Sequence, residues 1–391
     1  MRQEDKLRFN KNGKFVIIQV ADAQDLHFVR RTMVKMLNKA YDSVKPDLVV
    51  FAGDNILGNH LKDARFGTRE VVKTKEGEYK RMKKAISYIC EPLEKRKIPF
   101  TMIYGNHDDV NMMTKEEQAD IYRSYNMCIG LNNPDKSVDV DTFNLPLYSS
   151  DGKRKLFNLW MIDSAWQDKK TGLSHEGVKA ETVEWYKRVS RELREENGGE
   201  PLPSLMFQHI PMPESASLQI ECDKNDPLAV PYYERGELRG YVKLDPAKAH
   251  GFLGEAMCCC HENYGQLEAL QEAGDVKAVV YAHDHTNNFI GEHDGIRIIQ
   301  SSCASFRCYG NHLRGVRVFE IDESEPSNFK TYFLTYWELC GTSLLSKARH
   351  LWDADECEKK KMTILASAGA VSLLGAGAAA ANYIFRRYKN G

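Results

Sequence analysis

The sequence lacks an excess of charge, paired cysteines and an apolar leader. Its 391 residues carry a formal net charge of -1, which argues against a broad nucleic-acid-binding surface, since such surfaces normally show a basic excess. No Cys-x-x-Cys pair occurs, so a structural zinc site of that kind is not expected. Residues 1–6 are mostly polar and charged, unlike the apolar core of a signal peptide.

The cysteines are clustered instead of paired. The run Cys258-Cys259-Cys260 fits poorly into a regular disulfide framework. We therefore expect reduced, mostly buried thiols in a reducing compartment, which favours the cytoplasm for the main body of the chain.

The C-terminal region has a different composition. Residues 362–385 contain no charged side chain and are rich in Ala, Gly and Leu. As a helix this run would span roughly 35 Å, enough for a bilayer core. We expect a transmembrane helix at 362–385, preceded by a charged linker at 341–361 and followed by a basic tail at 386–391. The alternative is an Ala-rich helix packed on the body or on a partner, and its small residues would also permit helix-mediated self-association.

Residues 1–340 show alternating apolar strands and amphipathic helices, which predicts an α/β fold. Thr114 and Glu117 are spaced as a capping box at the start of a further helix. Residues 215–250 show no clean period and are interpreted as a long loop over the site. We expect strands at 15–20, 47–52, 100–104, 156–162, 204–208 and 276–282, helices at 31–44, 79–95, 177–195 and 266–272, and antiparallel strands at 296–301, 316–321 and 330–336 completing a second sheet.

Polar side chains follow most of these strands directly. The stretch after 100–104 is Asn106, His107, Asp108 and Asp109, preceded by Gly105. In an α/β sheet the carboxyl ends of parallel strands meet at one edge, so these side chains should meet others from neighbouring strands. The residues so collected are Asp22, Asp54, Asn106, His209, His283 and His285, with His107 beside them.

Carboxylate, amide and imidazole groups suit borderline metals such as Mn, Fe and Zn. Six ligands are too many for one tetrahedral ion, but they suit two ions bridged by a carboxylate. A bridging water would be deprotonated near neutral pH and could attack phosphorus in line.

The ordered motifs resemble the calcineurin-like metallophosphoesterase superfamily, and the branch related to purple acid phosphatases in particular. The resemblance covers roughly residues 12–337 and includes Phe207-Gln208-His209-Ile210-Pro211. It implies a four-layer sandwich of two mixed sheets flanked by helices, with a dimetal site on their shared edge. The motifs are Asp22, Gly53-Asp54-Asn55, Gly105-Asn106-His107-Asp108, His209 and His283-Asp284-His285.

The resemblance also implies roles for the single residues. Asp54 would bridge the ions, Asp22 and His285 would bind the first, and Asn106, His209 and His283 would bind the second. His107 would stabilise or protonate the leaving oxygen. Asp108 would orient His107, or alternatively would cap a turn or helix.

Two positions depart from the family pattern. The first motif is usually Asp-x-His, whereas this chain has Asp22-Ala23-Gln24, and Gln24 would be a weaker, neutral ligand of the first ion. Asp25-Leu26-His27 fits Asp-x-His three residues later, so His27 is the alternative ligand. Ala282 stands where the family usually has Gly, which is tolerated if the backbone there has negative φ.

These expectations define a metal-dependent phosphoesterase that hydrolyses a phosphomonoester or phosphodiester, with its catalytic domain in the cytoplasm and a membrane anchor. Its partners would be a phosphorylated substrate and the membrane, with no nucleic acid. A nuclease is one alternative. The other is a membrane-tethered binding or scaffold protein whose first metal site has decayed, which Gln24 suggests.

Overall fold

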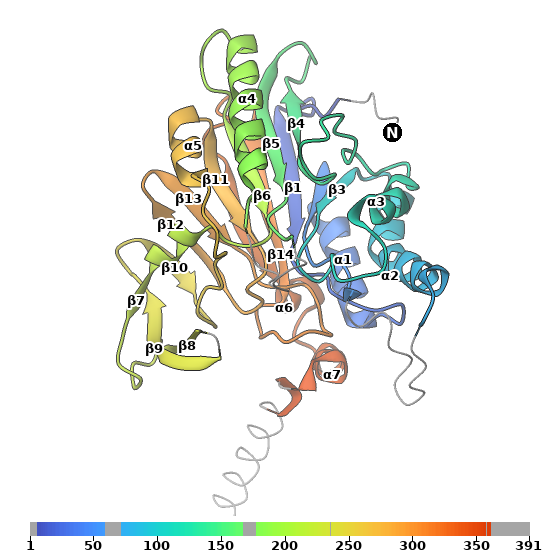
Figure 1. Ribbon diagram of the computed structural model, residues 1–391. Coiled ribbons are helices and arrows are strands. Elements are labelled where there is room, and N and C mark those ends of the chain that lie inside the picture. Colours follow the sequence, from blue (N-terminus) through green and yellow to red (C-terminus); the bar gives the residue numbers. More distant parts are fainter. Residues whose placement is uncertain (1–5, 59–71, 167–176, 235, 357, 361–391) are drawn as a thin grey trace, which may run out of the picture.

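The computed structural model describes residues 6–58, 72–166, 177–234, 236–356 and 358–360 (Figure 1). It confirms a mixed α/β fold with several sheets and helices. All nine described cysteines are free, and Cys258 is exposed whereas Cys260 is buried. Among the described residues no helix is long and apolar enough to cross a bilayer. The expected helix at 362–385 and the tail after it lie outside the described residues.

The first sheet holds the N-terminal strands. β1, β2 and β3 run parallel to one another, and β14 pairs with β1 in the antiparallel direction. The central strand β2 is entirely apolar and buried because both faces of the sheet are covered there. In order across the sheet they are β15 (Lys330–Thr335), β14 (Gly315–Asp322), β1 (Lys14–Val20), β2 (Leu48–Ala52) and β3 (Phe100–Ile103).

The second sheet is also mixed. β5, β6, β11 and β13 run parallel, and β4, β12 and β10 pair in the antiparallel direction. The order is β10 (Ala249–Phe252), β12 (Asn288–His293), β13 (Ile296–Gln300), β11 (Val276–Tyr281), β6 (Ser204–Gln208), β5 (Lys155–Ile162) and β4 (Phe143–Tyr148).

The main core lies between the two sheets. Phe207 of β6 meets Phe319 of β14 edge to face, with ring centroids 5.9 Å apart. Side chains of β5 alternate, because Phe157 faces this core whereas Trp160 belongs to a second core beneath α4 and α5. Each buried aromatic side chain contributes about 2–3 kcal/mol by its removal from water.

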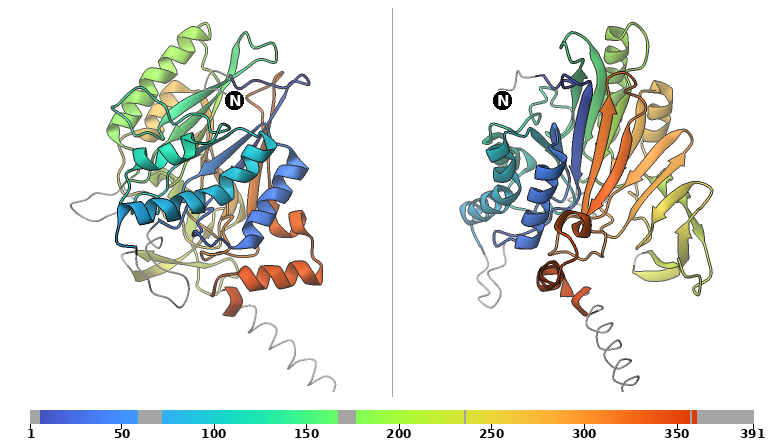
Figure 2. Two further views of the ribbon diagram at one scale, coloured as in Figure 1. Left: turned by 90° about the vertical axis from the view of Figure 1, so that its right-hand side faces the viewer. Right: turned by 180° about the vertical axis from the view of Figure 1, so that it is seen from behind.

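Helices cover the outer faces of both sheets (Figure 2). Three lie on the first sheet, and two lie on the second beside Trp160. Thr114 forms the predicted capping box at the start of α3. The helices are α1 (Arg31–Val44), α2 (Lys75–Arg96) and α3 (Lys115–Arg123) on the first sheet, and α4 (Ala180–Glu196) and α5 (Gln266–Ala273) on the second.

The prediction of a loop at 215–250 is wrong. This segment forms a small three-stranded sheet in the order β7-β9-β8, preceded by a short 3-10 helix. Its strands leave most residues exposed, so the sequence shows no alternation of apolar and polar residues. The elements are η2 (Pro213–Leu218), β7 (Gln219–Glu221), β8 (Val230–Glu234) and β9 (Glu237–Leu244).

The prediction for the late strands is partly wrong. β14 and β15 are antiparallel as expected, but they extend the first sheet beside β1. β13 belongs to the second sheet and runs parallel to β11, after a hairpin with β12 that the sequence pattern did not indicate.

The segment expected as a charged linker at 341–361 carries a docked helix. α6 (Tyr336–Cys340) is followed by α7 (Leu344–Asp353), whose Asp353 carboxylate accepts the backbone N–H of Thr32 at 2.8 Å. Beyond α7, the buried guanidinium of Arg314 pairs with Asp355 at 2.6 Å and Glu358 at 2.9 Å. The chain is therefore fixed to the body as far as Glu358.

Candidate metal centre

The predicted ligands follow strands that end at one edge of the molecule. The edge is shared by the two sheets, because residues from both meet there. Asp22 follows β1, Asp54 follows β2, Asn106 follows β3, His209 follows β6, and His283 and His285 follow β11.

Asp22, Asp54 and His209 form the centre of this group. All three are buried, and each offers a ligand atom within 4.8 Å of the others. His209 Nε2 lies 3.5 Å from Asp54 Oδ1 and 3.2 Å from Asn106 Oδ1. On the other side, His285 Nε2 lies 3.5 Å from Asp22 Oδ1. The His283 ring lies 5.1 Å from the His209 ring, so the structure brings the predicted strand-end ligands together in one cluster.

The backbone at this edge is strained. Asp22, Asp54 and His283 have φ values of 46°, 47° and 72°. Non-glycine residues rarely adopt this region, and each instance costs on the order of 1–3 kcal/mol. His283 also donates its backbone N–H to Asp22 Oδ2 at 3.1 Å, which joins the two sheets. Three strained residues in one cluster of polar groups are typical of a functional site.

Two glycines are required by the same crowding. A Cβ at Gly53 would lie 2.4 Å from His209 Nδ1, and Gly53 has a φ of 90°. A Cβ at Gly105 would lie 2.2 Å from Asp54 Oδ1. The Gly-Asp and Gly-Asn motifs therefore let one strand end approach the side chains of another. Ala282 has no positive φ and is fully buried, so this departure from the family pattern is accommodated.

Two imidazoles are oriented by backbone carbonyls. His209 Nδ1 donates to the Ala52 carbonyl at 2.9 Å, and His285 Nδ1 donates to the Tyr309 carbonyl at 3.0 Å. In each ring Nε2 is then directed toward the carboxylates. This outer hydrogen bond fixes the ring and is the usual arrangement of metal-ligating histidines.

Charges in the cluster are strongly coupled. Burial would raise the pKa of Asp54, but the imidazoles of His209 and His107 hold it well below its usual value. Burial would lower the pKa of His209, yet the Asp54 carboxylate raises it to about 9. Without a metal ion, the site is therefore held together by an ion pair between Asp54 and protonated His209.

Gln24 faces the same carboxylate. Its side-chain Nε2 donates to Asp54 Oδ2, and its backbone N–H donates to the Asp54 carbonyl at 2.9 Å. The residue is buried. Gln24 thus occupies the position of the histidine in the family pattern, but it presents an amide N–H to Asp54. Turning the amide over would present its oxygen instead.

His107 and Asp108 have different surroundings. The backbone N–H of His107 donates to Asp54 Oδ1 at 2.8 Å, and its ring Nε2 lies 4.0 Å from Asp54 Oδ2 with the side chain 32% exposed. The Asp108 carboxylate accepts backbone N–H groups from Gly105, Asn55 and Ile56. Asp108 therefore has the turn-capping contacts that were its alternative assignment.

The alternative motif at 25–27 is not at the cluster centre. The carboxylate of Asp25 accepts a hydrogen bond from the Arg307 guanidinium and the backbone N–H groups of Leu26 and Arg30. The ring of His27 packs edge to face against Phe28 at 4.9 Å. Asp22, not Asp25, supplies the carboxylate of the first motif.

The residues fit a pair of divalent ions. Asp22 Oδ1 is buried and accepts no hydrogen bond within the usual distance from the described residues, while the His285 imidazole lies 3.5 Å away; a bound cation would satisfy this oxygen. Carboxylate, amide oxygen and imidazole nitrogen surround it. These are the types of metal ligand that suit Mn, Fe or Zn.

Comparison with known proteins agrees with this geometry. The family model for calcineurin-like phosphoesterases matches residues 25–287. The chain belongs to this family. Similar proteins include "Probable inactive purple acid phosphatase 29" of Arabidopsis thaliana, 27% identical over 354 residues that cover 82% of this chain and 80% of that protein. "Probable inactive purple acid phosphatase 14" of the same plant is 28% identical and covers 81% and 77%.

The solved structures that match the chain are more distant in sequence. A dimetal phosphatase from Danio rerio aligns with 82% of this chain and 99% of its own, at 13% identity and a TM-score of 0.45. A purple acid phosphatase from yellow lupin covers 85% and 56%, at 10% identity and a TM-score of 0.42.

The sequence analysis missed the residues that contact His285, Gln24 and Asp22 from outside the cluster. Tyr309 stacks on the His285 ring at 4.3 Å, and its hydroxyl donates to Glu255 at 2.9 Å. Ser305 donates its hydroxyl to the Gln24 carbonyl at 2.6 Å and its N–H to the Asp22 carbonyl at 3.1 Å. These residues lie on loops, where no periodicity could have indicated them.

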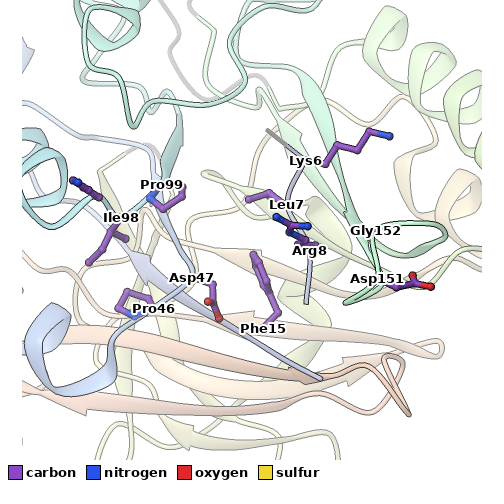
Figure 3. A pocket seen from close by; sticks show the side chains of 11 residues that line it. Lys6, Leu7, Arg8, Phe15, Pro46, Asp47, Ile98, Pro99, Asp151 and Gly152 are labelled. Carbon is purple, nitrogen blue, oxygen red and sulfur yellow. The ribbon is translucent and has the colours of Figure 1, made fainter. Parts of the chain in front are cut away.

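A separate hollow of about 750 Å³ lies at the opposite ends of the strands (Figure 3). Lys6, Arg8 and Asp47 line it, and the Asp47 carboxylate accepts the backbone N–H of Val16 at 2.8 Å. None of the strand-end ligands lines this hollow, so it is distinct from the candidate metal centre.

Proposed function

We propose that this chain is a metal-dependent phosphoesterase acting on a phosphomonoester or a phosphodiester. The observation that carries the proposal is the buried group of Asp22, Asp54 and His209, whose ligand atoms lie within 4.8 Å of one another at strained strand ends. Two bound ions would supply Lewis acidity and lower the pKa of water to near neutrality.

The chain would hold the two ions on either side of Asp54. Asp22 and His285 lie on one side, with Gln24 next to them. On the other side would be Asn106 and His209, joined by His283, whose ring centroid lies 5.1 Å from that of His209. The outer hydrogen bonds to the Ala52 and Tyr309 carbonyls keep each Nε2 directed inward.

His107 is assigned to the leaving group. Its ring is partly exposed beside the buried carboxylates, and its backbone is tied to Asp54. A ring in this position can hold a proton at Nε2 and give it to the departing oxygen. Asp108 supports this task indirectly, because it fixes the turn that carries His107.

The proposal is tested by metal content and turnover together. Full-length protein is purified, its metal is counted by elemental analysis, and p-nitrophenyl phosphate and its bis ester are assayed with added Mn²⁺. We expect two ions and metal-stimulated hydrolysis, which Asp54→Asn abolishes. His250→Ala is the control, because this exposed histidine lies on β10 away from the cluster. Hydrolysis that survives Asp54→Asn would contradict the proposal.

A second candidate is a binding protein of the same fold. Gln24 favours it, because an amide N–H directed at Asp54 competes with a cation for Oδ2. The similar Arabidopsis proteins carry the word "inactive" in their names. One bound ion without turnover in the same experiment would support this candidate over the enzyme.

We also propose that the uncharged run at 362–385 anchors the protein in a membrane, with the catalytic domain in the cytoplasm. The proposal rests on the sequence of the run and on the basic residues at both of its ends. Deleting residues 359–391 should move the protein from the membrane fraction to the soluble fraction. Full-length protein that stays in solution without detergent would contradict it.

A further inference from the structure

Helix α7 has its polar and apolar faces reversed. The residues it buries against the body are Ser346, His350 and Asp353. A surface helix normally buries its apolar stripe and exposes its polar one. The outward face of α7 instead carries large apolar side chains, with exposed fractions of 86% for Leu344, 59% for Leu345, 40% for Leu351 and 80% for Trp352.

This face adjoins a cationic groove. A hollow of about 1180 Å³ lies between α7 and the start of α1, and Trp352 is part of its wall. Only two carboxylates line it, and one of them, Asp353, is engaged by the Thr32 N–H. The cations that line it are Arg30, Arg31, Lys35, Arg307, Arg349 and Lys359.

Part of this positive charge has no ion-pair partner among the described residues. Arg31, Lys35 and Arg349 form no ion pair with any described residue, and α1 has no acidic residue in its first turn. The groove is therefore suited to anionic groups at its mouth.

The chain beyond α7 is tethered close to this surface. Arg314 holds Glu358 to the body, and the uncharged run begins four residues later at Met362. Four extended residues span at most about 14 Å. Whatever receives the run at 362–385 must therefore lie within that distance of Glu358.

We propose that the outer face of α7 and the neighbouring groove form a surface that rests on an anionic lipid bilayer. The exposed Leu and Trp side chains would enter the boundary between headgroups and acyl chains, and Arg31, Lys35 and Arg349 would face lipid phosphates. Leucine, tryptophan and basic residues together on one face are the composition of interfacial helices. A protein partner would not explain why the uncharged run follows at such short range.

The surface lies at the same end of the molecule as the strand-end cluster (Figure 1). Arg307 lines the groove and pairs with Asp25, which follows Asp22 by three residues. The bilayer contact would thus hold the catalytic edge near the membrane. The choice of a bilayer as the occupant rests on the proposed anchor at 362–385, but the inference does not depend on catalysis.

The first test locates Trp352 in the lipid-bound, full-length protein. Vesicles of phosphatidylcholine and phosphatidylglycerol are prepared with brominated acyl chains, which quench tryptophan at the headgroup boundary. We expect quenching in the wild type and loss of that quenched component in Trp352→Phe, which keeps an apolar ring. The other four tryptophans serve as the internal background.

Three outcomes would overturn the inference. Trp352 in vesicle-bound protein could remain open to aqueous iodide and insensitive to bromolipid, so that α7 faces water. Trp352 could be shielded in buffer without lipid at every protein concentration, so that the chain's own C-terminal run covers the face. Shielding that rises with protein concentration would instead show that a second copy covers it.

The second test removes charge from the groove. Arg31→Ala/Lys35→Ala should weaken the Trp352 contact with anionic vesicles by roughly fivefold per charge, and added salt should reduce it in the wild type. The matched control is Lys11→Ala/Lys277→Ala, which removes two exposed or partly exposed cations near the opposite strand ends. Equal loss in both double variants, or contact that is independent of phosphatidylglycerol, would contradict the inference.

Discussion

The two halves of the candidate metal centre are built differently around Asp54. On the His209 side every donor matches the family pattern, and two glycines allow the strand ends to approach within van der Waals distance. On the Asp22 side the histidine of the pattern is replaced by Gln24, and support comes from loop residues such as Tyr309 and Ser305.

The difference indicates which half determines the behaviour of the site. The His209 half is enclosed by β2, β3 and β6, so its geometry is set by the sheets. Asp22 and His285 also follow strands, but the Asp22 half depends in addition on one neutral amide and on loop residues. We therefore expect the His209 half to bind the second ion more tightly, and the Asp22 half to decide whether the first ion is retained.

The largest expected effect comes from removing one imidazole from each half. His209→Ala should abolish binding of both ions and lower turnover by about a thousandfold, more than the roughly 10–100-fold that loss of an outer hydrogen-bond partner costs. His285→Ala should lose one ion only. Elemental analysis and p-nitrophenyl phosphate turnover measure both variants. The comparison fails if His285→Ala is the variant that loses both ions.

A larger side chain in the His209 half should lower the stability of the protein. Gly53→Ala should destabilise the protein by about 3 kcal/mol, because the new Cβ meets His209 and the backbone has a positive φ. Gly295→Ala is the control, since its φ is also positive but nothing lies within 4 Å of the Cβ, and it should cost about 1 kcal/mol. Denaturant unfolding gives both values, and equal losses would show that crowding is unimportant.

Metal binding to the His209 half should weaken as pH falls. The pKa of His209 in the metal-free protein is raised to about 9, so below that pH an ion must displace a proton from Nε2. The apparent affinity should fall by up to about tenfold for each pH unit below 9. Equilibrium dialysis with Mn²⁺ at several pH values measures this, and an affinity that is flat with pH would contradict it.

The smallest expected effect is a gain in metal affinity. Gln24→His restores the imidazole of the family pattern beside Asp22 and should tighten binding of the first ion by about tenfold. Equilibrium dialysis with Mn²⁺ measures this affinity as the dissociation constant of the more weakly bound of the two ions. Unchanged binding in this variant would place residue 24 outside the coordination sphere.

The sequence predicted the parts of the molecule in which a buried apolar strand is followed directly by polar residues. The strands that lead to Asp54, Asn106 and His209 are short, buried and mostly apolar, and the ligand residues begin where each strand ends. This pattern follows from burial of parallel strands on both faces. For the same reason the order of residues along the chain was enough to assign the ligand positions to one edge.

The parts that the sequence did not predict have no hydrophobic period. β8 and β9 expose most of their side chains, so they resemble a loop in sequence. Helix α7 shows helical spacing with its apolar face outward, and its docking depends on a few polar contacts such as that between Asp353 and Thr32. The turn contacts of Asp108 depend on backbone N–H groups from two loops, which no single motif encodes.

Arg314 has a mechanical consequence for the whole molecule. Its guanidinium forms ion pairs with Asp355 and Glu358 near the end of the described residues, and it also donates a hydrogen bond to the carbonyl of Ser305. Ser305 in turn holds the backbone of the segment that carries Asp22 and Gln24. A force applied along the C-terminal segment would therefore be transmitted through Arg314 and Ser305 to the Asp22 half of the metal centre. The His209 half, which has no such contact with Arg314 among the described residues, would be displaced less.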